Sequence, residues 1–266
     1  MASLIQSEEA FTRFIEGFKD ERGIVKYEQA LSETAGKGLR SVVVDFRDLY
    51  AFDAELAREV LSNPEDNLPR FDIAAFSKLR MRDPEYADQI QRVHVRFRGL
   101  PSETPLRRIG AEHIGRLVMV NGIIVRSTAV LPLLIKSAYR CTSCGEMILL
   151  EQTDEFLRVP SECPSCNRRR GFELVPRESV FIDSQRLTIQ ERPEELPPGQ
   201  LPRQVHVEPR DDIVDVARPG DRVSLTGSLG LLRRQGRGGT LRVFDFVLEA
   251  NNIDVSGREM ELLEIT

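Results

Sequence analysis

Four cysteines are the residues whose types and spacing most directly indicate chemistry in this chain. They form two Cys-x-x-Cys pairs, Cys141/Cys144 and Cys163/Cys166, with 18 residues between the pairs. Such spacing is typical of four thiolates around one Zn²⁺ ion. Two disulfides are the alternative, which a chain that reads as intracellular disfavours. Four protein ligands leave no open position for water, so the zinc is expected to be structural.

A second cluster lies in LLRRQGRGGTLRVFDF, residues 231–246. Four arginines lie around three glycines in it: Arg233, Arg234, Arg237 and Arg242, with Gly236, Gly238 and Gly239. Glycine permits the backbone of a tight turn, and the arginine fork suits phosphate oxygens. The stretch therefore indicates a hairpin that binds an anion. A solvated hairpin tip, with arginines that serve solubility, is the alternative.

Motifs for catalysis are missing from the sequence. There is no GxxxxGK(S/T) phosphate loop, GxSxG, HExxH or GxGxxG. His94, His113 and His206 are scattered and are expected to be ordinary surface or packed residues. A binding or assembly module is therefore favoured over an enzyme for this stretch of chain.

Composition indicates a soluble, globular and cytoplasmic protein. The 266 residues are 30% charged and 41% hydrophobic, and no apolar run approaches the length of a membrane helix. The net charge is −5, but residues 1–90 contribute −6 and the remainder +1. The 32 arginines outnumber the 5 lysines. A basic surface in the second part can therefore face an anion despite the acidic total.

Two patterns of apolar residues divide the chain. Helical spacing predicts helices over about 4–18, 24–34, 53–63 and 70–82, with Ser7 as a candidate cap, Asp53 near a helix start and a buried strand at 41–46. From residue 91, alternation and short strands with Pro and Gly punctuation predict a small Greek-key barrel. The phenylalanines of these strands are expected in its core. Asn121-Gly122 is either a turn or a bend inside a strand. Because strands flank the cysteines, the metal ribbon is expected to be an excursion from the barrel.

The segment ESVFIDSQRLTIQERPEELPPGQLPRQVHV, residues 178–207, resembles a signature of the minichromosome maintenance (MCM) replicative helicases. DSQ, IQE, PE, LP, G and PR recur in that family's N-terminal domain in this order. GRLVMVNGIIVRSTAVLPLLIKSAYRCTSCG resembles its first barrel strands running into its zinc ribbon, and RPGDRVSLTG a later strand. The resemblance covers nearly the whole chain, is strongest to the archaeal branch, and ends where the family's ATPase domain would begin.

The resemblance implies a mixed α and β fold: a helical domain, then a five-stranded OB-fold barrel with an inserted zinc ribbon of four cysteines and a projecting β-hairpin. The expected divisions are a helical domain, the first part of the barrel, the ribbon, the second part of the barrel with the hairpin, and a linker towards an ATPase domain. These span residues 1–90, 91–136, 137–177, 178–250 and 251–266.

The function implied is that of a collar that binds DNA and forms hexamers in an ATP-dependent replicative DNA helicase. The implied partners are single- and double-stranded DNA, further copies of the chain in a hexamer or double hexamer, its own ATPase domain and other replication factors, with no membrane. Zn²⁺ belongs to this part of such a protein, whereas ATP and Mg²⁺ belong to the motor domain. Localisation would be cytoplasmic, at the nucleoid.

Site residues follow from local matches to the family. DNA contacts would come from the hairpin arginines and from three barrel residues: Arg126, Arg186 and Arg203. A lysine that some archaeal relatives carry five residues after the first arginine is Leu131 here, with Lys136 further on. A further loop, which contacts the ATPase tier in the family, is matched at Gln190, Glu191 and Gly199.

Two other functions remain open at the level of sequence. One is a stand-alone single-stranded DNA-binding OB-fold protein with a zinc ribbon, which would stack bases on aromatic residues. Sparse aromatics and the absence of tryptophan count against it. The other is a zinc-stabilised assembly scaffold that is indifferent to DNA.

Overall fold

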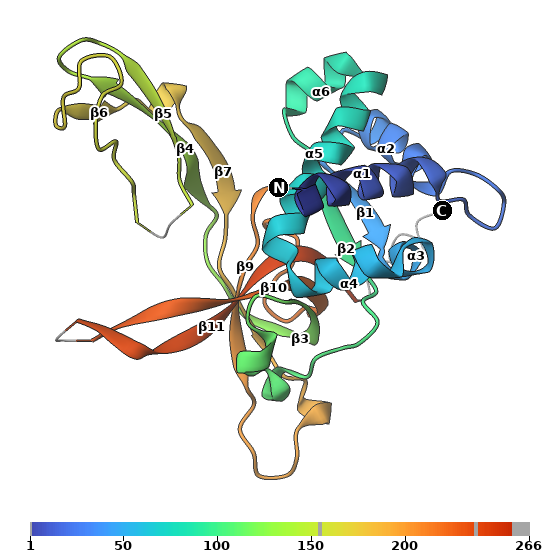
Figure 1. Cartoon of the computed structure of the whole chain (residues 1–266). Coiled ribbons are helices and arrows are strands. Elements are labelled where there is room, and N and C mark those ends of the chain that lie inside the picture. Colours follow the sequence, from blue (N-terminus) through green and yellow to red (C-terminus); the bar gives the residue numbers. More distant parts are fainter. Residues whose placement is uncertain (1, 154–155, 237–238, 257–266) are drawn as a thin grey trace.

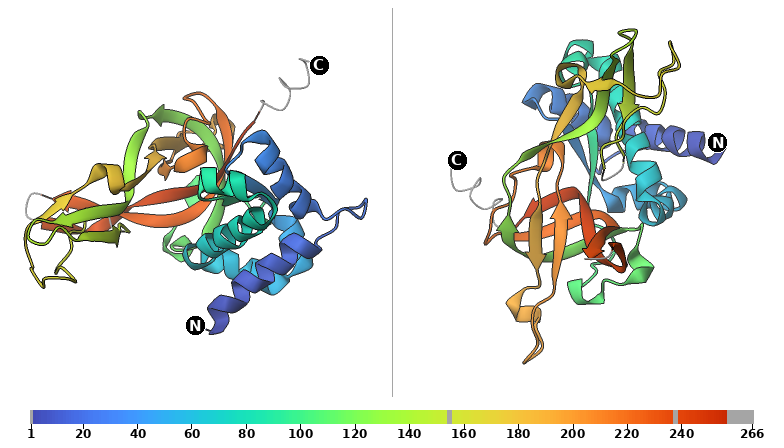
Figure 2. Two further views of the ribbon diagram at one scale, coloured as in Figure 1. Left: turned by 90° about the horizontal axis from the view of Figure 1, so that it is seen from above. Right: turned by 90° about the vertical axis from the view of Figure 1, so that its left-hand side faces the viewer.

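The computed structural model describes residues 2–153, 156–236 and 239–256 (Figure 1). An N-terminal unit of helices packs beside a β-barrel, from which a ribbon, a long hairpin and a loop project (Figures 1 and 2). The mixed α and β fold class predicted from the sequence is confirmed. No helix in the described part of the chain is long and apolar enough to cross a membrane.

Six helices and two strands form the N-terminal unit: α1 (Ala2–Gly17), α2 (Lys26–Lys37), β1 (Ser41–Asp45), α3 (Phe46–Phe52), α4 (Ala54–Ser62), α5 (Pro64–Arg82), α6 (Pro84–Ile90) and β2 (His94–Arg98). Asp53 caps α4, as its place near a helix start suggested, by accepting the backbone N–H groups of Glu55 and Leu56. Ser7 lies inside α1 rather than at its start. Helix α4 ends at Ser62, just before Asn63 and Pro64, and Pro64 then occupies the first turn of α5, where its missing N–H costs no hydrogen bond.

Phenylalanines fill the core of this unit. Phe11, Phe71 and Phe97 are fully buried, and the rings of Phe11 and Phe71 stack with centroids 4.0 Å apart. Strand β2, expected in the first part of the barrel, instead pairs in parallel with β1. Alternation shows only that one face of a strand is buried, and β2 buries Val95 and Phe97 against the helices.

The barrel contains five strands and closes in the order β10-β11-β9-β8-β3. These are β3 (Leu117–Ser127), β8 (Leu187–Gln190), β9 (Gln204–Glu208), β10 (Arg222–Gly236) and β11 (Gly239–Val255). Alternate residues point inward and form a separate core that includes Val120, Ile189 and Leu248. The five-stranded barrel predicted from the sequence is thus confirmed.

Gly122 lies in the middle of β3, so the Asn-Gly pair marks no turn. A β-carbon at this position would lie 2.5 Å from the carbonyl oxygen of Gln190 and 2.6 Å from the side chain of Ile189. The neighbouring strand β8 can approach β3 this closely only because residue 122 has no side chain.

The ribbon is an antiparallel sheet inserted between β3 and β8. Its strands are β4 (Leu131–Cys141), β5 (Met147–Glu151), β6 (Phe172–Leu174) and β7 (Val180–Ser184). Gln185 fixes the base of this excursion, because its buried amide bonds Ser127, the carbonyl of Thr128 and the N–H of Asp215.

Polar contacts join the helical unit to the barrel. The buried Asn251 of β11 accepts the N–H of Phe97 at 2.6 Å and donates to the carbonyl of Val95 at 2.9 Å, and so extends the edge of β2. Arg96, only 6% exposed, bonds the carbonyl of Asn251 and the carboxylate of Asp212.

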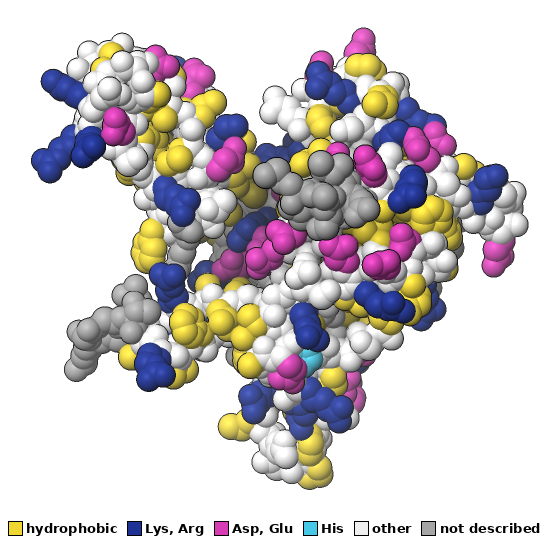
Figure 3. All heavy atoms as spheres, in the orientation of Figure 1, with side chains coloured by type: hydrophobic (Ala, Val, Ile, Leu, Met, Phe, Trp, Pro, Cys, Tyr) yellow, Lys and Arg dark blue, Asp and Glu magenta, His cyan; other side chains and the backbone are white. Residues whose placement is uncertain are grey.

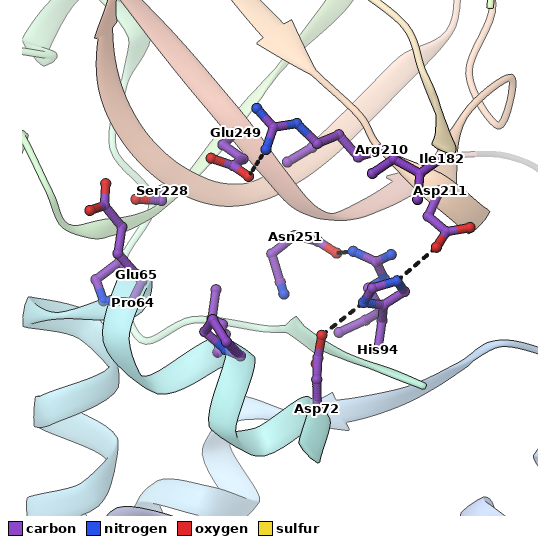
Figure 4. A pocket seen from close by; sticks show the side chains of 14 residues that line it. Pro64, Glu65, Asp72, His94, Ile182, Arg210, Asp211, Ser228, Glu249 and Asn251 are labelled. Carbon is purple, nitrogen blue, oxygen red and sulfur yellow. Dashed lines mark hydrogen bonds and ion pairs between the residues drawn. The ribbon is translucent and has the colours of Figure 1, made fainter. Parts of the chain in front are cut away.

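A charged cluster around Asp211 completes this contact (Figure 4). His94 lies between two carboxylates, with Nδ1 2.8 Å from Asp72 and Nε2 3.1 Å from Asp211. Burial by itself would lower the pKa of His94, but its hydrogen bonds to Asp211 and Asp72 raise that pKa to about 9. The hydrogen bond from His94, helped by Arg92 and Arg40, lowers the pKa of Asp211 to about 2 against the effect of burial.

Replacing Gly122 with alanine should lower the free energy of unfolding by about 1–3 kcal/mol, because the new methyl group overpacks the β3–β8 contact. Gly36→Ala is the matched control. No atom lies within 4 Å of a β-carbon at Gly36, which is in α2, so this change should stabilise by about 0.5–1 kcal/mol. Urea unfolding measures both. Equal changes in the free energy of unfolding for Gly122→Ala and Gly36→Ala would contradict the close approach of β3 and β8 at Gly122.

The ion pair between His94 and Asp211 should make the free energy of unfolding depend on pH. A His94 pKa raised from 6.5 to about 9 stabilises the fold fully below 6.5, and this contribution, on the order of 3 kcal/mol, is lost as the pH rises through about 9. Asp211, whose pKa is lowered, stabilises the fold fully above its ordinary pKa of 3.8. This stabilisation is lost as the pH falls towards about 2.

Urea unfolding below pH 6.5 and above pH 9 measures the dependence. The variant His94→Gln should lack the decline assigned to the imidazole. An identical decline in the native chain and the variant would show that His94 does not link the helical unit to the barrel.

Candidate metal centre and nucleic-acid interface

The four cysteines converge in the ribbon as a single cluster. Their sulfurs all lie within 4.8 Å of one another, with Cys141 and Cys166 at 3.7 Å and Cys144 and Cys163 at 3.6 Å. These separations exclude disulfides, which require about 2.05 Å. An ion about 2.3 Å from each sulfur, the usual distance in zinc thiolates, would place the sulfurs about 3.8 Å apart. The cluster can therefore hold one tetrahedral metal ion.

Two similar turns position these thiolates. Cys141 ends β4, and its carbonyl accepts the N–H of Gly145, which has a φ of 80°. In the second turn the carbonyl of Cys163 accepts the N–H of Asn167, which has a φ of 55°. Both turns thus end in a left-handed residue, glycine in one and the tolerant asparagine in the other.

The hairpin predicted from the arginine–glycine stretch is the projecting part of β10 and β11, with Gly236 paired to Gly239. Arg233, Arg234 and Arg242 are exposed along its arms. Arg237 and Gly238 lie outside the described residues. The carboxylate of Asp245 forms an ion pair with Arg234 at 2.9 Å, whereas Arg233 and Arg242 form none with another described residue.

The three predicted barrel arginines also differ in whether a carboxylate pairs with them. Arg126 on β3 stands in register with Thr188 on β8, which in turn stands opposite His206 on β9. Neither Arg126 nor the exposed Arg203 has a side-chain ion pair within the described ranges. Arg186, however, pairs with Glu208 at 2.7 Å.

Leu131 occupies the position at which some archaeal relatives carry a lysine. Leu131 is 63% exposed at the start of β4. Lys136 lies further along that strand and pairs with Glu151 of the ribbon at 3.2 Å. Lys136 thus lies on the stalk of the ribbon, where a ribbon carboxylate neutralises its charge.

The loop between β8 and β9 is held from inside. The buried carboxylate of Glu191 accepts two bonds from Arg107, at 2.8 and 3.0 Å, and the N–H of Arg203 at 2.9 Å. The bond from Arg107 chiefly lowers the pKa of Glu191, against desolvation. Glu191 therefore positions the loop and faces inward. Arg107, which the sequence did not single out, is its main partner.

The other matched residues of this loop have different settings. The side chain of Gln190 accepts a bond from Gln204 at 2.8 Å. Gly199 has a φ of 77°, which only glycine adopts readily. Leu201, two residues on, is 90% exposed.

A closed five-stranded barrel with a four-cysteine ribbon inserted after its first strand, and an arginine-bearing hairpin, defines an OB-fold protein. Two family descriptions match the sequence: the MCM N-terminal domain over residues 8–99 and the MCM OB domain over residues 105–233. The chain belongs to the minichromosome maintenance family, whose N-terminal and OB domains it carries.

Relatives extend the match over almost the whole chain. A minichromosome maintenance protein of Saccharolobus solfataricus is 35% identical over 97% of this chain and 38% of its own length. The DNA replication licensing factor mcm2 of Xenopus tropicalis is 30% identical over 96% of the chain and 29% of its own. The DNA replication licensing factor MCM3 of Oryza sativa is 31% identical over 92% of this chain and 33% of its own length. The chain thus spans about a third of the length of these relatives.

The cysteine cluster predicts one bound metal ion per chain. Cys163→Ser removes a buried ligand and should abolish stoichiometric binding, because three thiolates hold the ion far less tightly. Elemental analysis of purified protein measures the metal content. The barrel has its own core and should keep its circular dichroism signal. Metal-free native protein with four freely reactive thiols would contradict the site.

Proposed function

We propose that this chain is the DNA-binding collar of a replicative helicase, in which it encircles DNA as a hexamer and contacts phosphates through barrel and hairpin arginines. Membership of the MCM family supports a role in DNA replication. The helicase activity, with its ATP and Mg²⁺, would belong to a motor domain that the longer relatives have room for.

One observation carries the proposal: four arginines of the barrel and hairpin are exposed and uncompensated among the described residues. They are Arg126, Arg203, Arg233 and Arg242. An arginine paired with a carboxylate must give up that partner to bind phosphate, whereas a free one gains a charge-assisted bond outright. The free arginines should therefore dominate DNA binding. Arg186 and Arg234 should contribute less, because Glu208 and Asp245 already neutralise them.

The remaining features fit the same role. We propose Zn²⁺ as the ion of the cysteine cluster, because four thiolates in a closed tetrahedron favour it. The ribbons would join two hexamers. The loop from Gln190 to Arg203 would meet the ATPase tier through exposed residues such as Leu201 rather than through the buried Glu191. The expected domain divisions are retained as a proposal, with β2 assigned to the helical unit.

Charge removal at free and paired arginines tests the proposal. Arg233→Ala/Arg242→Ala should weaken binding of a labelled single strand and lower the salt slope by about 0.7 for each phosphate that the variant no longer binds. Arg186→Ala should have a smaller effect, and Glu208→Gln should strengthen binding by releasing Arg186. Fluorescence anisotropy over a salt series measures all of these.

The control is Arg47→Ala/Arg58→Ala, which removes the same charge from the helical unit and should leave the slope unchanged. Equal losses in the hairpin pair and the control pair would mean that net charge, and not the hairpin, governs binding. A native chain that ignores DNA at low salt would refute the collar, and sedimentation then decides whether it is an oligomeric scaffold.

A further inference from the structure

Two hollows share lining residues on β9: one lies on the wall of the barrel, and the other lies where the barrel meets the hairpin. The first, about 280 Å³, is lined by residues of β3, β8 and β9, including Arg126, Gln204 and His206. The second, about 190 Å³, is lined by Gln204 and His206 again, and by Arg203 and Phe244. The two hollows share Gln204 and His206 in their linings and are together called here the barrel–hairpin groove. Its lining includes Arg126 and Phe244.

Charge in this groove favours an anionic ligand. Arg126 and Arg203 are free, as described above. Asp245 is the only carboxylate among the residues that line the two hollows, and its charge is matched by Arg234 at 2.9 Å. Strands lie about 4.8 Å apart, so the three steps from β3 to β11 span about 14 Å, more than one phosphate requires.

Phe244 gives the groove a second kind of contact. The side chain is 42% exposed, which corrects the expectation that the phenylalanines of these strands lie in the core. It stands opposite Arg233 in the β10–β11 register. Within the described ranges its ring contacts no other aromatic ring, unlike Phe11, Phe14 or Phe71. Figure 3 shows basic and apolar side chains next to one another along the projecting hairpin.

We infer that Phe244 stacks against one base of a single-stranded nucleic acid whose flanking phosphates lie at Arg126 and Arg203, the barrel arginines of the proposed function. The inference rests on the proposed function and makes it more specific. A single strand offers the faces of its bases to an aromatic ring, and this contact tolerates any sequence. A duplex hides those faces in its own stack, so it can use the arginines but not Phe244.

The test replaces the ring and keeps apolar bulk. Phe244→Leu in the full chain should weaken binding of a labelled single strand about 5-fold to 100-fold, the range that base–aromatic stacking supplies. Binding of a duplex of the same sequence and the salt slope of single-strand binding should both stay as in the native chain. An oligonucleotide of abasic sites should bind the native chain and the variant alike. Fluorescence anisotropy measures each affinity.

The matched control is Phe181→Leu, since Phe181 is similarly exposed, at 40%, but lies on β7 in the ribbon. The chain contains no tryptophan, so Phe244→Trp creates a single reporter. This variant should bind single strands as tightly as the native chain, and its fluorescence should be quenched on binding. Phe181→Trp should not be quenched.

Selective loss in Phe244→Leu together with quenching in Phe244→Trp would establish the stacked base. Equal affinity of the native chain and Phe244→Leu for the single strand, with no quenching at saturation, would overturn the inference and leave the phosphate contacts standing. If the native chain binds neither strand form, the proposed function itself fails.

Discussion

Closure of the five-stranded barrel fixes where the ribbon, the loop and the hairpin leave it. It brings β3 against β8 at Gly122 and β10 against β11 at Gly227, where an added β-carbon would collide with the backbone of the facing strand. Three excursions leave from this closed ring: the ribbon between β3 and β8, the loop between β8 and β9, and the hairpin between β10 and β11. Their directions are therefore set by the barrel. Arg126, Arg203 and Phe244 come to the same side of the barrel because β8 and β9 connect β3 to β11 in the closed strand order.

The helical unit is attached differently. Its core of phenylalanines forms a cluster separate from the barrel core, but Leu117 of β3 packs into this cluster, and polar contacts add to that apolar one. Asn251 completes the edge of β2, and Asp211 gathers His94, Arg92 and Arg40 in a backbone conformation with a φ of 58°. Charges of this kind add to the apolar contact of Leu117 in holding the two folded units in one orientation. The acidic excess of the first 90 residues lies on this helical unit, away from the projecting hairpin (Figure 1).

Local patterns predicted much of this arrangement. Cysteine spacing identified the four-cysteine cluster, alternation identified the barrel strands, and glycines between arginines identified the hairpin. Side-chain ion pairs that depend on which strands lie side by side could not be predicted from local patterns. Whether Arg186 is free depends on Glu208, 22 residues away, and the partner of His94 lies 117 residues further on. Likewise, β2 alternates as a barrel strand would, but its apolar face packs against helices. The exposure of Phe244 follows from where β11 leaves the barrel, which no local pattern encodes.

Photochemical cross-linking decides whether the free arginines of the barrel and hairpin form the nucleic-acid surface. A single-stranded oligonucleotide carrying photoactive 4-thiothymidine would be irradiated with the full chain and the attached peptides identified by mass spectrometry. We expect cross-links near Arg126 on β3, between Arg203 and His206 on β9, and on the hairpin between Arg233 and Phe244. Cross-links confined to the ribbon or to helices α1–α6 would show that the nucleic acid binds elsewhere.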